Sequence, residues 1–267
     1  MPADLTLHAI LFAVAVTAGL IDSIAGGGGL LCVPALLAAG FSPAQTLATN
    51  KFQGMFGTFS ATLHYLRAGE ATLAPLLPAV VTVFAASGAG TLVVQGLDAR
   101  FLNKLLPFLL VGVAVWVLLS PRIGDADRHA RIGRKAFALT CAPLVGFYDG
   151  FFGPGAGSFF TVGLVELLGL NLRRATAETK VLNFTSNAAS VLFFLAGGKV
   201  VWSVGLVMAV GQFIGARIGA RAVIRKGSGL VRPCLVAVSL ALTIKLVGDD
   251  QQVWPHLIAA ARVFWGQ

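Results

Sequence analysis

The sequence predicts an all-α polytopic membrane protein, and three of its properties support this class. Of the 267 residues, 57% are hydrophobic and only 12% are charged, and the mean hydropathy is +0.84, well above that of average soluble domains. The apolar residues gather in stretches of about 17 to 25 residues, the length that crosses about 30 Å of hydrocarbon as a helix. The basic residues lie in the short connections between these stretches, as the positive-inside rule describes.

This topology accounts for the net charge of +9, so we expect a lipid bilayer and no nucleic acid as partner. Cys32, Cys141 and Cys234 lie singly, without CxxC spacing, which predicts neither a disulfide framework nor a zinc site. We expect no metal and no cofactor.

The first apolar stretch, residues 5–21, has no Lys or Arg before it and so lacks the basic region of a secretory signal peptide. We expect it to be a retained membrane helix. Two segments near 44–66 and 174–197 are mostly apolar but begin with polar clusters. The other uncharged stretches lie at 71–97, 105–120, 136–148, 181–198, 200–216 and 233–244.

Two short apolar pieces, 30–39 and 156–165, each follow a glycine cluster and are too short to span alone. These clusters belong to a repeat: "GLIDSIAGGGG", beginning at Gly19, returns as "GFYDGFFGPGAG", beginning at Gly146. Downstream, "GFSPAQTLATNKFQG" returns as "GLNLRRATAETKVLN". Asp22 is thereby matched with Asp149, and Lys51 with Lys180.

The repeat predicts an internal duplication within one integrated transmembrane domain. Residues 1–121 form the first half, 122–135 a basic cytoplasmic connection and 136–267 the second half. If each glycine-interrupted region is a hairpin that enters and leaves on one side, each half has three full crossings and the halves are inverted. If each region crosses once, the two basic clusters fall on opposite faces, so we favour inversion. These clusters are Arg122, Arg128, Arg131, Arg134 and Lys135, and Arg217, Arg221, Arg225, Lys226 and Arg232.

The glycine clusters predict broken helices. Each glycine costs about 1 kcal/mol relative to alanine in a helix, and an opened backbone is tolerated inside a bilayer only against protein or a water-filled cavity. Half-helices restarting at Leu30 and Ser158 would direct N–H groups and positive dipole ends into that cavity, which favours an anion. The alternative is that the glycines only allow close helix packing.

Asp22, Lys51, Asp149 and Lys180 are candidates for function, because a charge inside the bilayer costs about 2.5 to 3.5 kcal/mol. A structural alternative is that the aspartates pair with the lysines or cap a half-helix. The helix from about Arg174 carries a polar face formed by Thr176, Lys180, Asn183, Asn187 and Ser190. In the first half a comparable stripe comprises Asn50, Gln53, Gly57, Ser60 and His64. Two lysines with amides, hydroxyls and half-helix N-termini predict a small anionic substrate.

These motifs resemble the TauE/SafE family of sulfite and organosulfur-compound exporters and permeases. The resemblance covers essentially the whole chain and includes the paired "TNK" and "TKVLNF" motifs. It implies a multi-pass transporter of the bacterial inner membrane, with about eight nominal transmembrane segments, for small anions such as sulfite or sulfonates. The two motifs are unequal, since Thr49 is matched with Glu178 and Asn50 with Thr179. The substrate-binding positions expected are Gly26, Gly28, Asn50, Lys51, Gln53, Gly153, Gly155, Thr179, Lys180, Asn183 and Asn187, with Asp22 and Asp149 in proton coupling or support of the helix breaks.

The sequence therefore predicts a secondary transporter and not an enzyme, working by alternating access, with a proton as a candidate coupling ion. No Walker motif is present, which disfavours ATP-driven transport by this chain. An anion channel is the alternative. An intramembrane aspartyl protease would need two carboxylates that share a proton, and the expected GxGD motif is absent. The oligomeric state is left open.

Overall fold

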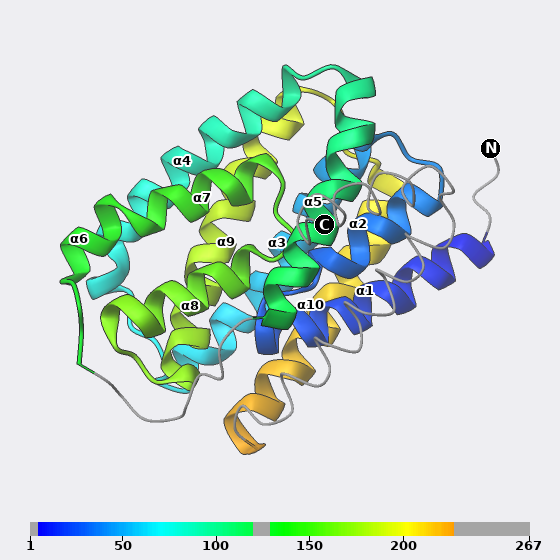
Figure 1. Cartoon of the computed structure of the whole chain (residues 1–267). Helices are drawn as coiled ribbons and strands as arrows, with labels where there is room; N and C mark the ends of the chain where they lie inside the picture. Colours follow the sequence, from blue (N-terminus) through cyan, green and yellow to red (C-terminus); the bar gives the residue numbers. More distant parts are fainter. Residues whose placement is uncertain (1–4, 120–128, 227–267) are drawn as a thin grey trace, which may run out of the picture.

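The computed structural model describes residues 5–119 and 129–226, and within these ranges it is all-helical (Figure 1). Segment 233–244, Cys234, Arg232 and residues 122–128 of the connection 122–135 lie outside the described residues. The helices are α1 (Leu5–Ala25), α2 (Gly29–Ala38), α3 (Pro43–Arg67), the 3-10 turn η1 (Ala74–Leu76), α4 (Leu77–Gln95), α5 (Ala99–Leu119), α6 (Arg134–Leu139), α7 (Cys141–Phe151), α8 (Ala156–Leu168), α9 (Leu172–Ala196) and α10 (Trp202–Lys226).

Within the described residues, the expected apolar segments are helices, with differences in detail. Segments 174–197 and 181–198 are one helix, α9. Segment 136–148 falls on two helices, because the backbone at Thr140 leaves the helical region at φ −122° and ψ −80°. The half-helices begin at Gly29 and Ala156, slightly before the expected Leu30 and Ser158.

Three described helices are long and apolar enough to cross a membrane: Leu5–Ala25, Ala74–Gln95 and Trp202–Ile224. Helices α3 and α9 have 25 residues each but carry many polar side chains, and those side chains are largely buried in the protein. The mean hydropathy of α3 and α9 is low because their polar side chains face the protein interior and not lipid.

Helix α1 lies beside α10, and glycines allow the two backbones to touch (Figure 1). A Cβ atom at Gly215 would lie 1.9 Å from the carbonyl oxygen of Val16. Gly211 faces Phe12 and Gly219 faces Leu20, so the two helices run parallel. Such small-residue contacts are the usual means by which membrane helices approach closely.

Replacing Gly215 by alanine should force α1 and α10 apart and lower the free energy of unfolding by about 1 to 3 kcal/mol. The thermal midpoint of the detergent-purified protein measures this change. Gly112→Ala on α5 is the matched control, because a Cβ atom there meets nothing within 4 Å. That variant should be neutral or slightly stabilising, and an equal midpoint for both variants would contradict the α1–α10 packing.

Helices α4 and α7 make the corresponding contact at the other side of the molecule. A Cβ atom at Gly150 would lie 2.0 Å from the carbonyl oxygen of Ser87, and Thr91 donates to the carbonyl oxygen of Gly150 at 3.0 Å. Ser87 also donates to the carbonyl oxygen of Ser186 at 2.9 Å and contacts the hydroxyl of Ser190 at 3.0 Å. These buried hydroxyls join α4, α7 and α9.

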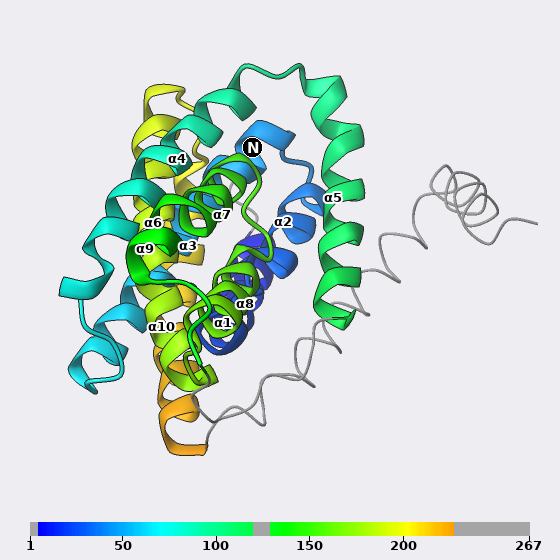
Figure 2. The ribbon, with the colours of Figure 1, turned by 60° about the vertical axis from the view of Figure 1, so that its left-hand side comes forward.

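The helices thus form two bundles: the α3 bundle, made of α1, α3 and α10, and the α9 bundle, made of α4, α7 and α9. In the α3 bundle, α10 also packs on α3, where Ser60 donates to the carbonyl oxygen of Phe213 at 3.0 Å. Each bundle combines helices from before and after the connection at 120–128. In Figure 2, α5 lies on the opposite side of the molecule from α4 and α9.

The bundles meet where α3 and α9 cross the molecule antiparallel to one another. Near one end, Arg173 at the start of α9 pairs with Glu70, just after α3. Farther along, the rings of Phe59 and Phe184 are 5.4 Å apart. From the first contact to the second, the residue number falls along α3 and rises along α9, so the two helices run in opposite directions.

The basic side chains gather at the end where α3 and α10 finish and α6 and α9 begin. His64 lies near Arg67, Arg217 and Arg221 there. Arg134 forms two hydrogen bonds with Glu178, at 2.9 and 2.8 Å, and these bonds raise the pKa of the Arg134 guanidinium above its ordinary value. The resulting ion pair explains why Glu178 departs from the repeat.

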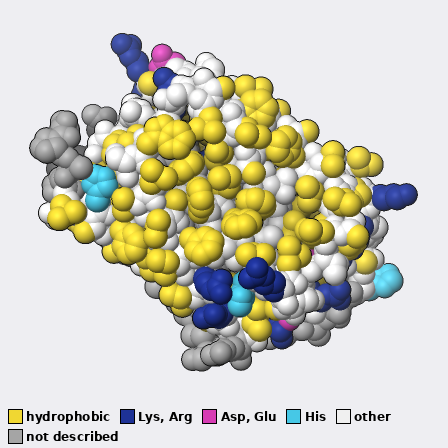
Figure 3. Space-filling view, turned by 180° about the vertical axis from the view of Figure 1, so that it is seen from behind, with side chains coloured by type: hydrophobic (Ala, Val, Ile, Leu, Met, Phe, Trp, Pro, Cys, Tyr) yellow, Lys and Arg dark blue, Asp and Glu magenta, His cyan; other side chains and the backbone are white. Residues whose placement is uncertain are grey.

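The outer surface between the ends is apolar. Figure 3 shows a broad hydrophobic face with Lys and Arg side chains at its edges. On α10, Leu206, Val210, Ile214 and Ile218 recur every fourth residue and are each 42–56% exposed. An exposed apolar stripe along a 25-residue helix fits contact with lipid tails and not with water.

Candidate functional site

The first glycine cluster breaks the chain between α1 and α2. Gly26 has a φ of +78°, which L side chains rarely adopt. The N–H of Gly26 bonds to the carbonyl oxygen of Asp22 at 2.8 Å, and the N–H of Gly28 bonds to Oδ1 of Asp22 at 3.2 Å. Asp22 therefore caps the break with both its backbone and its side chain.

The second cluster breaks the chain between α7 and α8. Gly153 has a φ of +98°, and a Cβ atom there would lie 3.1 Å from Nζ of Lys51. The absence of a side chain thus makes room for the lysine. The hydroxyl of Tyr148 donates to the carbonyl oxygen of Pro154 at 2.7 Å and holds the loop in place.

The two breaks touch each other in the middle of the molecule. A Cβ atom at Gly157 would lie 2.4 Å from Cα of Gly26, so the two backbones are in direct contact. Ser158 donates from its hydroxyl to the carbonyl oxygen of Ala25 at 2.9 Å. Although they are far apart in sequence, the glycine clusters form one junction.

Two charge pairs link the copies of the repeat, each between the lysine of one copy and the aspartate of the other. Nζ of Lys51 on α3 lies 2.5 Å from Oδ1 of Asp149 on α7. Nζ of Lys180 on α9 lies 3.3 Å from Oδ2 of Asp22 on α1 and also donates to the carbonyl oxygen of Asp22. Both lysine side chains are at most 2% exposed. Buried charges require such partners, and removal of one partner leaves the other as an unpaired buried charge.

These pairs agree with the structural alternative in the sequence interpretation, in which aspartates pair with lysines. They disagree with the protease alternative, because Asp22 and Asp149 bond to different lysines and share no hydrogen bond with each other. Among the described residues, no group of His, Cys, Asp and Glu side chains is placed to hold a metal ion.

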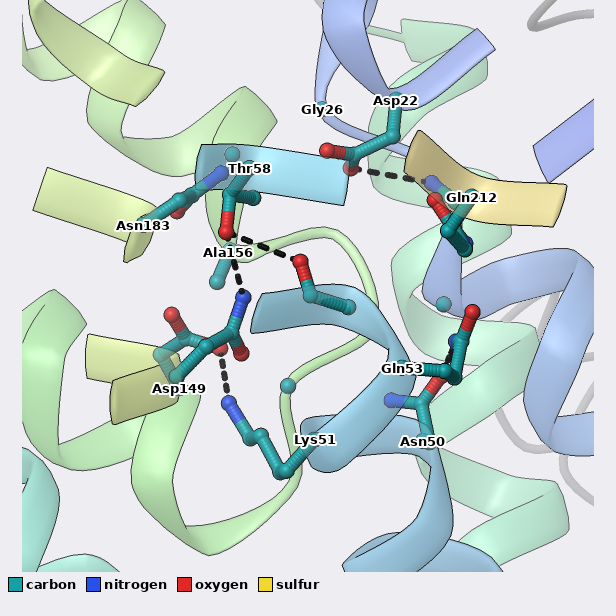
Figure 4. A pocket seen from close by; sticks show the side chains of 16 residues that line it. Asp22, Gly26, Asn50, Lys51, Gln53, Thr58, Asp149, Ala156, Asn183 and Gln212 are labelled. Carbon is teal, nitrogen blue, oxygen red and sulfur yellow. Dashed lines mark hydrogen bonds and ion pairs between the residues drawn. The ribbon is translucent and has the colours of Figure 1, made fainter. Parts of the chain in front are cut away.

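A cavity of about 40 Å³ lies at the junction of the breaks. Figure 4 shows polar side chains from α3, α7, α9 and α10 pointing toward it. Its lining comprises Asp22, Gly26, Gly28, Gly29, Asn50, Lys51, Gln53, Gly54, Thr58, Asp149, Gly153, Ala156, Gly157, Asn183, Asn187 and Gln212.

Most of the positions expected from the sequence line this cavity, and three do not. The Thr179 hydroxyl bonds to that of Thr161 at 3.0 Å. Lys180 is fully buried against Asp22. A Cβ atom at Gly155 would meet Val113 of α5 at 2.1 Å. Asn50 lines the cavity whereas its counterpart Thr179 does not, so the two copies contribute unequally.

The sequence interpretation did not single out Thr58 or Gln212, or the small residues Gly29, Gly54, Ala156 and Gly157. Gln212 is 2% exposed and is an amide within the apolar stretch 200–216. That isolation is a signal for a polar neighbour inside the protein. Thr58 accepts a hydrogen bond from Nδ2 of Asn187 at 3.4 Å, a contact that depends on how α3 crosses α9.

Several buried acceptors at the cavity have no hydrogen-bond partner among the described residues. They are Oε1 of Gln53, Oδ2 of Asp149 and Oδ1 of Asn183. Rotating the terminal amide group of Asn or Gln by half a turn exchanges the positions of its oxygen and its NH₂ group. Gln53 and Asn183 can therefore donate to an anion or accept from a protonated group.

Comparisons with known proteins agree with the resemblance in the sequence. The family model described as "Sulfite exporter TauE/SafE" matches residues 11–246. A "Probable membrane transporter protein ORF9" of Sinorhizobium sp. is 49% identical over 248 residues, 92% of this chain and 95% of the relative. No solved structure matches the chain.

Two further relatives carry similar names. A "Probable membrane transporter protein" of Haemophilus influenzae is 46% identical over 96% of this chain and 100% of its own length. The "Probable membrane transporter protein YfcA" of Escherichia coli K12 is 49% identical over 91% of each chain. With a family match over nearly the whole sequence, the chain belongs to the TauE/SafE family and is a membrane transporter, not an enzyme.

Proposed function

We propose that this protein is a secondary transporter that moves a small oxyanion, such as sulfite, a sulfonate or a related organosulfur anion, across the bacterial inner membrane by alternating access. The observation that carries the proposal is the cavity at the junction of the two breaks, lined by Lys51 and by side-chain amides. The description of the family, sulfite exporter, supports the substrate class.

An anion suits the cavity for electrostatic reasons. Lys51 supplies an ammonium group, and Asn50, Gln53, Asn183 and Asn187 supply amides. Helices α2 and α8 begin beside the cavity, at Gly29 and Ala156, so their positive dipole ends lie near it. The small volume favours a compact anion and disfavours a bulky one.

We further propose that the chain passes the membrane several times as two inverted halves. The antiparallel course of α3 and α9 supports this arrangement, as do the reciprocal contacts of α1 with α10 and of α7 with α4. Helices α1 and α2 would enter from the end opposite the basic side chains, and α7 and α8 from the basic, cytoplasmic end. The last expected segment, 233–244, lies outside the described residues.

In this proposal the moving units are the α3 bundle and the α9 bundle, and not the two sequence halves. Close glycine contacts hold α1 to α10 and α4 to α7, and we expect each bundle to move as a unit. The Lys51–Asp149 and Lys180–Asp22 pairs bridge the bundles at the centre, and Arg173–Glu70 bridges them at the basic end. Rocking of one bundle against the other would open these contacts in turn.

The test is anion counterflow in proteoliposomes that contain the purified protein. Vesicles loaded with sulfite or methanesulfonate should accumulate the labelled anion from outside, and the initial rate should saturate with its concentration. Protein-free vesicles are the control. A rate that rises without saturation, and without trans-stimulation by the internal anion, would favour the channel alternative over the transporter.

A further inference from the structure

The two charge pairs of the repeat have different surroundings. Lys180 lies outside the cavity lining and bonds to both the carbonyl oxygen and Oδ2 of Asp22. The other carboxylate oxygen of Asp22 accepts the N–H of Gly28. Asp22 also lines the cavity, but both of its carboxylate oxygens have partners, Lys180 on α9 and Gly28 in the first break, so this pair ties the break to α9.

The second pair faces the cavity and is incompletely satisfied. Lys51 and Asp149 both line the cavity, and their contact uses only Oδ1 of the carboxylate (Figure 4). Asp149 is 4% exposed, and its Oδ2 is buried without a hydrogen-bond partner among the described residues. Unlike Lys180, Lys51 makes no hydrogen bond to a backbone carbonyl of a break within the part of the chain that the structure describes, so its contact with the carboxylate is the bond that would have to open.

Oδ2 of Asp149 differs in kind from the two other unpartnered acceptors at the cavity. Gln53 and Asn183 can turn their amides and present N–H groups. A carboxylate has only acceptor oxygens until it is protonated, and then it carries one O–H donor. Protonation of Oδ2 therefore neutralises the carboxylate and turns this unpartnered acceptor into a donor.

We propose that Asp149 binds the coupling proton of the transport cycle. The ammonium group of Lys51 then exchanges its contact with Asp149 for a contact with the anion. This inference rests on the proposed function. A proton from solution adds to Oδ2, and the neutral carboxylic acid no longer holds the ammonium group of Lys51. The anion takes the place of the carboxylate at Nζ. Proton and anion leave together on the opposite side, which makes the cycle a symport, while the Asp22–Lys180 pair stays closed.

The other charged groups around Asp149 do not take this role. Asp22 of α1 and Lys180 of α9 are bonded to each other. Tyr148 on the same helix bonds to Pro154. Helix α4 carries no ionisable side chain, while Glu166 of α8 and Arg134 of α6 pair with Arg131 and Glu178 at the basic end.

The experiment measures proton uptake when methanesulfonate binds to the detergent-purified protein in weakly buffered solution. The charge of this anion does not change near neutral pH. At alkaline pH, binding should take up about one proton per anion, and affinity should rise about tenfold per unit as the pH falls. Asp149→Asn, which imitates the protonated acid, should bind methanesulfonate with no proton uptake and no dependence on pH.

Asp98→Asn is the matched control, because Asp98 lies at the start of α5 and accepts the N–H of Arg100. It should retain the proton uptake of the unaltered protein. Asp149→Glu, which keeps the carboxyl group, should retain proton uptake on methanesulfonate binding, with a displaced pH midpoint. This variant tests the proposal if Asp149→Asn does not fold. Binding of methanesulfonate without proton uptake, or unchanged uptake in Asp149→Asn, overturns the proposal but leaves anion transport intact. Failure of both methanesulfonate and sulfite to bind overturns the proposed function as well.

Discussion

Replacing Lys51 by methionine is expected to lower saturable anion flux in proteoliposomes by about 100-fold or more, because it removes the cation of the cavity and strands Asp149. Truncation of one member of a buried, hydrogen-bonded charge pair costs about 2 to 5 kcal/mol. Lys51 lies 2.5 Å from Asp149, and both side chains are at most 5% exposed. Initial counterflow rates at several anion concentrations measure the effect.

The double variant Lys51→Met, Asp149→Asn separates the two causes. It removes the stranded carboxylate and should recover thermal stability, yet flux should stay low because no ammonium group faces the anion. Lys104→Met is the matched control, since Lys104 is exposed on α5. A well-folded Lys51→Met protein with undiminished flux would remove Lys51 from the anion site.

The equivalent change at Lys180 should act through stability. Lys180 bonds to the carbonyl oxygen and carboxylate of Asp22 and does not line the cavity. Lys180→Met should therefore lower the thermal midpoint more than Lys51→Met does, with flux lost because the first break moves. Equal midpoints for the two variants would contradict this division between the pairs.

Replacing Gly157 by alanine is expected to separate the two glycine breaks and to abolish transport. The added Cβ would lie 2.4 Å from Cα of Gly26 and 2.8 Å from Nδ2 of Asn183. Backbone cannot yield as a flexible side chain can, so we expect about 1 to 3 kcal/mol of lost stability and a distorted cavity. Thermal unfolding and counterflow of the same preparation measure both effects.

The Gly112→Ala variant on α5 again provides the comparison, because it adds the same methyl group in open space. Its flux and thermal midpoint should match those of the unaltered protein or slightly exceed them. Transport by Gly157→Ala at the unaltered rate would mean that contact between the breaks is not needed for the cavity.

The sequence alone predicted the helices and the positions of the breaks. Hydropathy and helix length depend on neighbours along the chain, and the glycine clusters interrupt helices by local backbone preference. The repeat also indicated Asp22, Lys51, Asp149 and Lys180 as candidate functional residues, because a charge within an apolar membrane segment is energetically costly. All four are found where the breaks meet, as the cavity lining or its direct support. The duplication itself and the transport roles of these residues remain predictions.

Tertiary structure decided which of these residues meet. The pairing of Lys51 with Asp149 and of Lys180 with Asp22 joins segments that are 98 and 158 positions apart, and it depends on how α3 meets α7 and how α9 meets α1. The packing of these helices also leaves Lys180 and Thr179 outside the cavity lining and brings Thr58 of α3 and Gln212 of α10 to it. Local sequence sets backbone preference and hydropathy, whereas the partner of a buried charge is set by helix packing between distant segments. Only the folded protein therefore distinguishes the charge pair that holds a break from the charge pair that faces the cavity.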